Sequence, residues 1–332
     1  MLKFAIIGCG AIGSRHALHA ASTGQLTAVC DIVKEKAGNL AREFKARPYT
    51  RIEEMLRGEP DVDVVAVCTP NGLHAGHTIL ALKAGFHVIC EKPMALGSDD
   101  CRRMIGQAVS SGRQLFVVKQ NRLNPPVMAV KQMLDAGACG RIFSIQMNAC
   151  WNRGAAYYSD SWHGSHDMDG GILYTQFSHF IDLLCWMIGD VKEVYACLDN
   201  FSHQGLIDFE DTVVASLRFE NGALGSLHFS INSYRKNMEG SILIVAEKAT
   251  LKIGGQYLNT LEYLRAETED KAVLATGGPA NDYGAYQGSM SNHDKIYRHV
   301  MEVIEQRQSN QFDGAAGLKT VEVIEKIYKA AK

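Results

Sequence analysis

The feature that most constrains the fold is a short apolar run near the start of the chain that breaks into three spaced glycines. The run covers residues 4–7, and Gly8, Gly10 and Gly13 follow it in the pattern G-x-G-x-x-G. The first glycine of this pattern allows a tight turn after a strand, the second lets backbone amides approach a pyrophosphate, and the third lets the next helix pack against the sheet. Phosphates then lie at the N-terminus of that helix, where unpaired N–H groups and the helix dipole favour an anion. The pattern therefore predicts a strand, a loop and a helix that bind a dinucleotide.

An acidic residue completes this fingerprint. A second apolar run, residues 26–30, ends in Asp31. An acid about 20 residues after the glycines accepts hydrogen bonds from both ribose hydroxyls of NAD and repels the additional phosphate of NADP. We therefore expect NAD as the cofactor. Lys34 and Lys36 follow closely, so NADP is the alternative if Asp31 turns away, and a strand–turn–helix without a ligand is the alternative for the glycines alone.

Composition excludes several classes of protein. The 332 residues exceed what one hydrophobic core usually serves, so we expect two domains. A hydrophobic content of 46% and a formal net charge of -2 are typical of a soluble globular protein. Basic residues are scattered, which argues against nucleic acid or a membrane surface as a partner. The first apolar run has only the length of a strand, so we expect neither a signal peptide nor a membrane span, and a cytoplasmic protein.

Cysteine usage agrees with that compartment. The nine cysteines are an odd number and include no C-x-x-C pair. Most stand in apolar segments, where a thiol packs as a small hydrophobic group. A reducing compartment therefore fits better than a disulfide framework.

Apolar strands alternate with helical segments from residue 1 to about residue 120. The expected strands are residues 4–7, 26–30, 64–68, 87–90 and 114–118. This alternation predicts an α/β fold with a parallel, doubly wound sheet, that is, a Rossmann domain. Ligands of such sheets lie beyond the carboxyl ends of the strands, so we expect the loops C-T-P-N-G-L-H and C-E-K-P-M to face the cofactor. The expected cofactor-binding residues are Gly8, Gly10, Ala11, Ile12, Gly13, Asp31, Ile32, Thr69, Pro70, Asn71, His74, Glu91, Lys92 and Gln120.

The pattern changes after two consecutive prolines at residues 125 and 126. We expect a helix, a strand, an aromatic loop and a second helix at residues 127–136, 142–150, 151–162 and 171–187. Longer strands with alternating polarity follow at residues 191–198, 212–219, 223–232, 241–246 and 250–253. They predict hairpins in a mostly antiparallel sheet, and therefore an α+β domain. We expect a loop and two final helices at residues 276–292, 293–306 and 318–330.

Two side chains outside the fingerprint suggest catalysis. Lys92 stands in E-K-P at a strand end, where a lysine beside the nicotinamide can hydrogen-bond a substrate oxygen and partial burial lowers its pKa. By itself, Lys92 is better explained as a surface lysine in a turn at the strand end. Helical spacing places Thr175, His179 and Asp182 on neighbouring positions of one face. Because this helix follows two glycines and the aromatic loop, we expect it to form the wall of a pocket.

These motifs together make the chain resemble the Gfo/Idh/MocA oxidoreductases over essentially its whole length. The resemblance rests on G-C-G-A-I-G, C-T-P-N, E-K-P and the His-x-x-Asp helix, in this order. It implies a Rossmann domain over residues 1–120, and a domain over residues 121–332 that binds substrate and forms the oligomer through an open sheet, as a homotetramer. It also implies that Lys92 and His179 are the catalytic pair and that the Lys92–Pro93 bond is cis. His179 is then the expected general base and Lys92 polarises the reacting oxygen, with the reverse assignment left open.

Four further segments are similar to the UDP-N-acetylglucosaminuronate 3-dehydrogenases of bacterial surface-polysaccharide synthesis. They are residues 116–124, 151–162, 222–226 and 237–242. The similarity implies that NAD oxidises the C3 hydroxyl of a UDP-N-acetylhexosaminuronic acid to a ketone. Basic side chains suit its carboxylate and diphosphate, and aromatic side chains suit stacking or hydrogen bonding. The expected substrate-binding residues are Lys119, Asn121, Arg122, Arg153, Tyr157, Tyr158, Thr175 and His179.

Two departures leave alternatives open. Thr175 stands where the resemblance implies Asn or Asp, and W-H-G at residues 162–164 stands where it implies W-R-G. The missing arginine weakens the expectation for the substrate but not for the type of reaction. One alternative is a dehydrogenase of inositol, a free sugar or another nucleotide sugar. The other is a non-catalytic NAD-bound regulator, which needs the glycines but not both Lys92 and His179.

A cluster of possible metal ligands also lies in the aromatic region. It consists of His163, His166, Asp167 and Asp169. We expect no metal, because the nicotinamide already supplies the electron sink and one local loop rarely supplies a full ligand set with its supporting hydrogen bonds.

Overall fold

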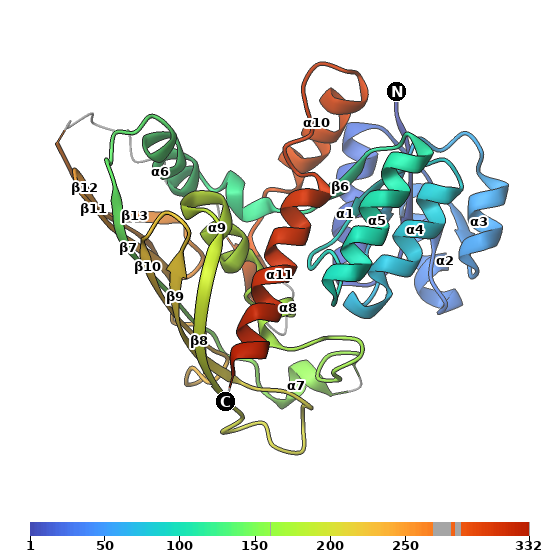
Figure 1. Cartoon of the computed structure of the whole chain (residues 1–332). Helices are drawn as coiled ribbons and strands as arrows, with labels where there is room; N and C mark the ends of the chain where they lie inside the picture. The colour runs from blue at the N-terminus through green and yellow to red at the C-terminus, as the bar shows by residue number, and fades with distance from the viewer. Residues whose placement is uncertain (160, 268–279, 283–286, 332) are drawn as a thin grey trace. The chain divides into compact units, whose positions relative to one another are not determined.

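The computed structural model describes residues 1–159, 161–267, 280–282 and 287–331 (Figure 1). The chain divides into two compact units, each made of two segments. The first unit is Met1–Val118 with His293–Val321, and the second is Lys119–Asn292 with Glu322–Lys332. The roles expected for residues 1–120 in cofactor binding and for residues 121–332 in substrate binding stay predictions.

A six-stranded parallel sheet forms the centre of the first unit, in the order β3-β2-β1-β4-β5-β6. Its strands are β1 (Lys3–Ile7), β2 (Gln25–Cys30), β3 (Arg47–Tyr49), β4 (Val64–Val67), β5 (His87–Cys90) and β6 (Leu115–Val117). Their chain order reverses between β1 and β4, which is where ligands bind to sheets of this class. The predicted Rossmann fold is confirmed.

Helices pack around this sheet in the first unit. They are α1 (Ala11–Thr23), α2 (Lys34–Phe44), α3 (Ile52–Gly58), α4 (His74–Lys83), α5 (Ser98–Ser111) and α10 (His293–Ile304), with the short 3-10 helix η1 (Asn71–Leu73). All four residues of β4 are fully buried. A strand that is apolar at every position is typical of a parallel sheet covered on both faces.

The second unit contains a mixed sheet of seven strands, in the order β13-β12-β11-β7-β10-β9-β8. Its strands are β7 (Ile142–Cys150), β8 (Val191–Asp199), β9 (Thr212–Phe219), β10 (Leu224–Ser230), β11 (Glu239–Ala246), β12 (Ala249–Gly254) and β13 (Thr260–Ala266). Only the β7–β10 pair is parallel among these neighbours. The predicted, mostly antiparallel sheet is confirmed.

One face of this sheet packs against helical segments. The second unit contains η2 (Gln120–Leu123), α6 (Pro125–Asp135), α7 (Ala155–Tyr158), α8 (Ile172–Thr175) and α9 (Ser178–Ile188), and α11 (Gly314–Ala330) begins in the first unit and ends in the second. Phe177 stacks on Phe229 of β10 with ring centroids 4.8 Å apart, and Phe180 lies 5.7 Å from the same ring. These aromatic contacts fix α9, and with it His179, against the sheet.

Two predictions about secondary structure need correction. The helix expected at residues 171–187 is two helices, α8 and α9, because Phe177 has a non-helical backbone with φ of -112° and ψ of 3°. The loop expected at residues 276–292 contains the paired strands β14 (Ala280–Asp282) and β15 (Gln287–Met290). The other parts of that loop up to residue 286 lie outside the described residues. Among the described residues, no helix combines the length and apolar character needed to cross a bilayer.

Candidate functional site

The glycine loop between β1 and α1 leaves space for a ligand at one glycine only. Gly8 has a φ of +97°, and a Cβ there would lie 2.5 Å from the Cys68 carbonyl oxygen. A Cβ on Gly13 would lie 1.9 Å from the Gly8 carbonyl oxygen. A Cβ on Gly10 would meet no atom within 4 Å. Gly8 and Gly13 are therefore required by the packing of the loop itself, whereas the open space at Gly10 lies at the N-terminus of α1, where amides lack intrahelical acceptors.

Asp31 is attached to this loop by its own side chain. Its Oδ2 accepts a hydrogen bond from the Cys9 backbone N–H at 2.8 Å, and its Oδ1 accepts one from the Val33 N–H at 2.8 Å. The neighbouring Ile32 side chain is 91% exposed. The carboxylate is thus fixed at the end of β2, beside the glycines, as the fingerprint predicts.

The loops after β4 and β5 are joined by one buried histidine. The Nε2 of His74 lies 2.8 Å from the carbonyl oxygen of Thr69, and its Nδ1 lies 2.7 Å from that of Pro93. Burial lowers the pKa of His74, although the hydrogen bonds to both carbonyl oxygens oppose this shift, because the ring donates to both only when each nitrogen carries a proton. The C-T-P-N and E-K-P loops are therefore held together at the carboxyl ends of their strands.

Lys92 directly precedes Pro93, whose carbonyl oxygen His74 contacts. The backbone N–H of Lys92 donates to Glu91 Oε2 at 3.0 Å. The Lys92–Pro93 peptide bond is cis, in agreement with the resemblance. Lys92 therefore follows β5 at the edge of the sheet where the sequence places it.

The second unit contains the predicted histidine on α9. His179 is 5% exposed, and its Nε2 lies 3.2 Å from the side-chain Nε2 of Gln120 in η2. Because an amide nitrogen donates, we assign the lone pair of the ring to Nε2 and the proton to Nδ1. His179 thus offers an acceptor at Nε2.

A buried cluster of charges ties η2 to the same helix. Arg122 donates to Asp182 through Nε and Nη2, both at 2.7 Å, and Lys119 donates to Asp182 Oδ1. Burial raises the pKa of Asp182, but the positive charges of Lys119 and Arg122 outweigh it and lower that pKa to about 2. Lys119 and Arg122 thus fix η2 on α9, and their expected contacts with substrate stay a prediction.

Arg153 lies in a second buried network of this unit. It is 2% exposed, and its Nε donates to Gln176 Oε1 at 3.1 Å while its Nη1 donates to Asn237 Oδ1 at 3.2 Å. Its guanidinium lies 5.3 Å from the ring centroids of both Trp151 and Tyr157. The planar cation is therefore held between aromatic rings and amides.

Two of the four possible metal ligands that follow the aromatic loop, His163 and Asp169, make contacts within the protein. Asp169 accepts hydrogen bonds from the Gly164 N–H at 2.8 Å and from the Thr175 hydroxyl. His163 stacks on Tyr157 with ring centroids 4.3 Å apart, and its Nδ1 lies 3.6 Å from Asp169 Oδ2. The Thr175 hydroxyl is therefore used in a contact within the protein. His163, which stands where the resemblance implies an arginine, stacks on Tyr157.

Two residues that are predicted to bind substrate, Asn121 and Tyr158, carry buried polar atoms without a hydrogen-bond partner among the described residues. Within the described part of the chain, neither the Asn121 Oδ1 nor the Tyr158 hydroxyl has a hydrogen-bond partner. Asn121 is 3% exposed and Tyr158 is 5% exposed. Buried polar atoms are normally satisfied, so a ligand group that reached these two atoms would supply what the protein does not.

Comparison with known proteins identifies the family. The model described as the oxidoreductase family with NAD-binding Rossmann fold (GFO_IDH_MocA) matches residues 2–119, and the GFO/IDH/MocA C-terminal domain matches residues 127–252. The solved WlbA dehydrogenase of Bordetella pertussis, in complex with NADH and UDP-GlcNAcA, is 32% identical with a TM-score of 0.90, and the alignment covers 99% of this chain and 96% of that one. The chain belongs to the Gfo/Idh/MocA oxidoreductase family.

Other members of the Gfo/Idh/MocA family show similar agreement. The WlbA structure from Chromobacterium violaceum, also with NADH and UDP-GlcNAcA, is 32% identical, with a TM-score of 0.90 over 99% of this chain and 93% of that one. The levoglucosan dehydrogenase of Pseudarthrobacter phenanthrenivorans is 26% identical over 85% of this chain and 82% of its own length. The family resemblance stated from the motifs is thus confirmed.

Membership in the Gfo/Idh/MocA family makes this chain an NAD-dependent oxidoreductase, so the expected cofactor and enzyme class are confirmed. The residues present fit NAD, because the backbone at Gly10 is open to the close approach of a ligand and the carboxylate of Asp31 is of the type that can accept hydrogen bonds from ribose hydroxyls. NAD supplies the carbon that accepts a hydride.

Several residues of the site were missed by sequence reasoning. Gln176 and Asn237 hold Arg153, and Glu210 accepts hydrogen bonds from the Tyr328 hydroxyl at 2.7 Å and the Ile172 N–H at 3.2 Å. Asn237 begins one of the segments similar to the UDP-sugar dehydrogenases, which was the available signal. Glu210 lies far along the chain from α8, so no local spacing pointed to it.

Proposed function

We propose that the protein oxidises the C3 hydroxyl of UDP-N-acetylglucosaminuronic acid, or of a closely related UDP-N-acetylhexosaminuronic acid, to a ketone with NAD as oxidant. The observation that carries this proposal is the similarity over 99% of the chain, at 32% identity, to a dehydrogenase solved with NADH and UDP-GlcNAcA. The four segments at residues 116–124, 151–162, 222–226 and 237–242 support the same substrate class.

His179 is the proposed general base. Its Nε2 already accepts a hydrogen bond from Gln120, so a lone pair is available at this atom. A sugar hydroxyl that replaces Gln120 as the donor can pass its proton to Nε2 as the carbon–hydrogen bond breaks. Lys92 is proposed to donate a hydrogen bond to the same sugar oxygen and to stabilise the charge that develops on it.

Buried cations of the second unit suit the acidic substrate. Lys119 and Arg122 carry two positive charges and Asp182 carries one negative charge, so their buried cluster keeps a net charge of about +1. Buried Arg153 adds another. Such cations favour a carboxylate or a diphosphate, and Asn121 and Tyr158 offer neutral polar atoms to the sugar.

A panel of candidate substrates tests this proposal through NADH formation. UDP-GlcNAcA is expected to be oxidised faster than UDP-N-acetylglucosamine, UDP-glucuronic acid, inositol and levoglucosan at equal concentrations. UDP-GlcNAcA is also expected to raise the Tm of the NAD-bound protein more than UDP-N-acetylglucosamine does, because the additional carboxylate gains a cationic partner. Oxidation of a free sugar or of inositol, with no UDP-sugar oxidised, would contradict the proposal.

A second candidate is a dehydrogenase of a free sugar or polyol. It is favoured by His163, which replaces the arginine implied by the closer resemblance and stacks on Tyr157. A His163→Arg variant separates the two candidates. If the protein acts on a UDP-uronic acid, His163→Arg is expected to have a lower KM for UDP-GlcNAcA than the native protein. If it acts on a free sugar, His163→Arg is expected to turn over the neutral substrate more slowly and to gain nothing with UDP-GlcNAcA.

We also propose that the protein is a cytoplasmic homotetramer assembled through the mixed sheet. Tyr195, Val214 and Leu224 are 69%, 52% and 49% exposed, and the strand register places them on the same face. Large apolar side chains that remain exposed on one sheet face favour an interface there. Sedimentation equilibrium of the purified protein tests this assembly, with Val214→Glu expected to lower the mass of the oligomer.

A further inference from the structure

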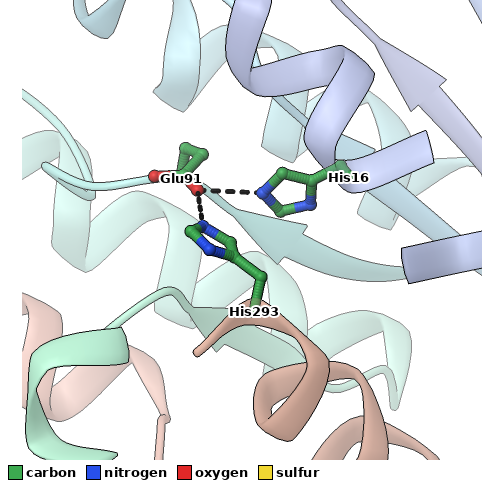
Figure 2. A group of neighbouring side chains, drawn as sticks. All are labelled: His16, Glu91 and His293. Carbon is green, nitrogen blue, oxygen red and sulfur yellow. Dashed lines mark hydrogen bonds and ion pairs between the residues drawn. The ribbon is translucent and has the colours of Figure 1, made fainter. Parts of the chain in front are cut away.

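Three buried residues from distant parts of the chain meet within the first unit, as Figure 2 shows. His16 comes from α1, Glu91 directly follows β5, and His293 is the first residue of α10. They are 0%, 4% and 1% exposed. The Nε2 atoms of His16 and His293 lie 2.9 and 3.1 Å from one oxygen, Glu91 Oε1. We call these three residues the Glu91 cluster.

The hydrogen bonds of the Glu91 cluster assign its protons. Glu91 is a carboxylate and only accepts, so the Nε2 atoms of both imidazoles donate to it. Burial raises the pKa of Tyr297 well above its usual range, so its hydroxyl keeps its proton, and this hydroxyl lies 2.9 Å from His16 Nδ1. Burial lowers the pKa of His293, which makes it a neutral donor at Nε2. Burial raises the pKa of Glu91, but hydrogen bonds from His16 and His293 outweigh it and hold that pKa well below its usual range.

The other carboxylate oxygen is directed at Lys92. Glu91 Oε2 accepts the backbone N–H of Lys92 at 3.0 Å. On the other side of Lys92, the carbonyl oxygen of Pro93 lies 2.7 Å from His74. The main chain around Lys92 is therefore held from both sides by buried groups of the first unit. Through His16, this support also reaches the helix that begins at the glycine loop.

Two histidines and a carboxylate also form a known type of metal-ligand set. In the Glu91 cluster, however, both imidazoles point their Nε2 atoms at the same oxygen over hydrogen-bond distances, and the second oxygen is bonded to an amide. A metal needs the lone pairs of both Nε2 atoms, whereas these atoms carry protons here. The contacts therefore favour a hydrogen-bonded anchor over a metal site.

We propose that Glu91, held by His16 and His293, is a positioning residue that fixes the main chain of Lys92 and aligns it with the helix of the glycine loop. The proposal rests on the proposed function, in which Lys92 acts on the substrate oxygen. Without the carboxylate, the amide of Lys92 loses its acceptor and two imidazole N–H groups are left without theirs. Lys92 then samples positions in which it no longer reaches the reacting oxygen, and displacements of this size lower turnover strongly.

The first experiment compares Glu91→Ala, Glu91→Gln and Glu59→Ala. Glu59 is a matched control, because it is a buried carboxylate of the same unit that bonds Tyr49 at 2.7 Å and is remote in sequence from the E-K-P loop. Glu91→Ala is expected to lower kcat for UDP-GlcNAcA about tenfold or more. Glu59→Ala is expected to lower Tm without lowering kcat.

Glu91→Gln supplies the conservative rescue. Its carbonyl oxygen can accept the Lys92 N–H, and its two amide protons can bond the two Nε2 atoms once both rings move their proton to Nδ1. We therefore expect Glu91→Gln to recover most of the lost turnover. Spectra of ¹⁵N-labelled histidine rings should show the Nε2–H form of His16 and His293 in the native protein and the Nδ1–H form in Glu91→Gln.

The outcomes separate the inference from the proposed function. If Lys92→Met abolishes turnover while Glu91→Ala matches Glu59→Ala, the positioning role is wrong and the proposed role of Lys92 stands. If Lys92→Met turns over normally, the proposed function itself is wrong at this residue. A shift of both Nε2 resonances on addition of Zn²⁺, reversed by a chelator, would overturn the inference in favour of a metal site. If Glu91→Ala does not fold, His293→Asn takes its place in the comparison with Glu59→Ala. A lower kcat of His293→Asn then supports the positioning role, and a kcat equal to that of Glu59→Ala overturns it.

Discussion

Both units hold a buried carboxylate close to a predicted catalytic residue, but they do so by different means. In the first unit, Glu91 is held by imidazole N–H groups and by a backbone amide. In the second, Asp182 is held by the cationic side chains of Lys119 and Arg122. The difference matters because loss of the carboxylate leaves imidazole and amide N–H groups without an acceptor in the first unit, whereas it leaves buried cations without a counter-charge in the second. We therefore expect the loss of the Asp182 carboxylate to cost more stability than the loss of the Glu91 carboxylate.

The largest expected effect follows from removing the charge of Asp182. Asp182→Asn leaves the buried Lys119 and Arg122 without a counter-charge, which we expect to lower the free energy of unfolding by about 3–5 kcal/mol. Denaturant unfolding measures this loss. The exposed pair Lys131–Asp135 provides the control, because Asp135→Asn is expected to cost less than about 1 kcal/mol.

The pH dependence of the Asp182 cluster has a defined sign. The pKa of Asp182 is about 2 in the folded protein and 3.8 ordinarily, so its contribution to stability is fully present above about 4. It is lost as the pH falls from there through about 2. Asp182→Asn should therefore flatten the fall in stability over this acid range. If stability falls over this acid range in Asp182→Asn as much as in the native protein, the charges of the Asp182 cluster do not stabilise the fold as proposed.

The next prediction concerns the catalytic residue that each cluster supports. Lys92→Met and His179→Asn should each lower kcat by about a hundredfold or more, while the Kd for NAD stays nearly unchanged. The double variant should lose much less than the product of the two single losses, because both residues serve one proton transfer. Steady-state rates and NAD titrations test this. Near-normal turnover of His179→Asn would leave Lys92 as the only candidate base.

Glu210 sharpens the comparison, because it is a buried carboxylate of the second unit whose hydrogen-bond donors, the Tyr328 hydroxyl and the Ile172 N–H, are neutral. Burial raises its pKa from the ordinary 4.5 to about 7, although the Tyr328 hydroxyl bonds it. Since the folded pKa is the higher one, its stabilising contribution is complete below about 4.5 and is lost as the pH rises through about 7. Glu210→Gln should therefore remove a fall in Tm over this range. Tyr328→Phe should move the fall to higher pH.

The sequence predicts those parts of the fold that are buried in a regular pattern. Apolar runs and alternation located nearly all the strands of both sheets. The exposed edge strands β3 and β13 were not predicted, because β3 has three residues including Pro48 and β13 has no fully buried position. The break between α8 and α9 was missed because Phe177 fits the apolar period of one continuous helix while packing against Phe229.

The candidate site divides in the same way. Gly10, Asp31 and Lys92 stand at strand ends that the local sequence identifies, so their places were predictable. The Glu91 cluster joins residues 16, 91 and 293, and Arg153 is held by residues 176 and 237. Such contacts depend on how separate elements pack, and no spacing within one segment encodes them.

The smallest expected effect concerns Asp31, which tests the first unit's use of backbone donors. Its carboxylate accepts the Cys9 and Val33 N–H groups, so its negative charge is fixed where the ribose is expected. NAD should therefore bind at least about tenfold more tightly than NADP, a difference of about 1.4 kcal/mol. Asp31→Asn keeps an acceptor for one backbone N–H but removes the charge, so it should narrow this difference with little loss of Tm. Asp31→Ala removes both acceptors and should lower Tm as well. Fluorescence titration with both reduced cofactors measures the preference, and equal or tighter binding of the phosphorylated cofactor by the native protein would show that Lys34 or Lys36 determines it instead.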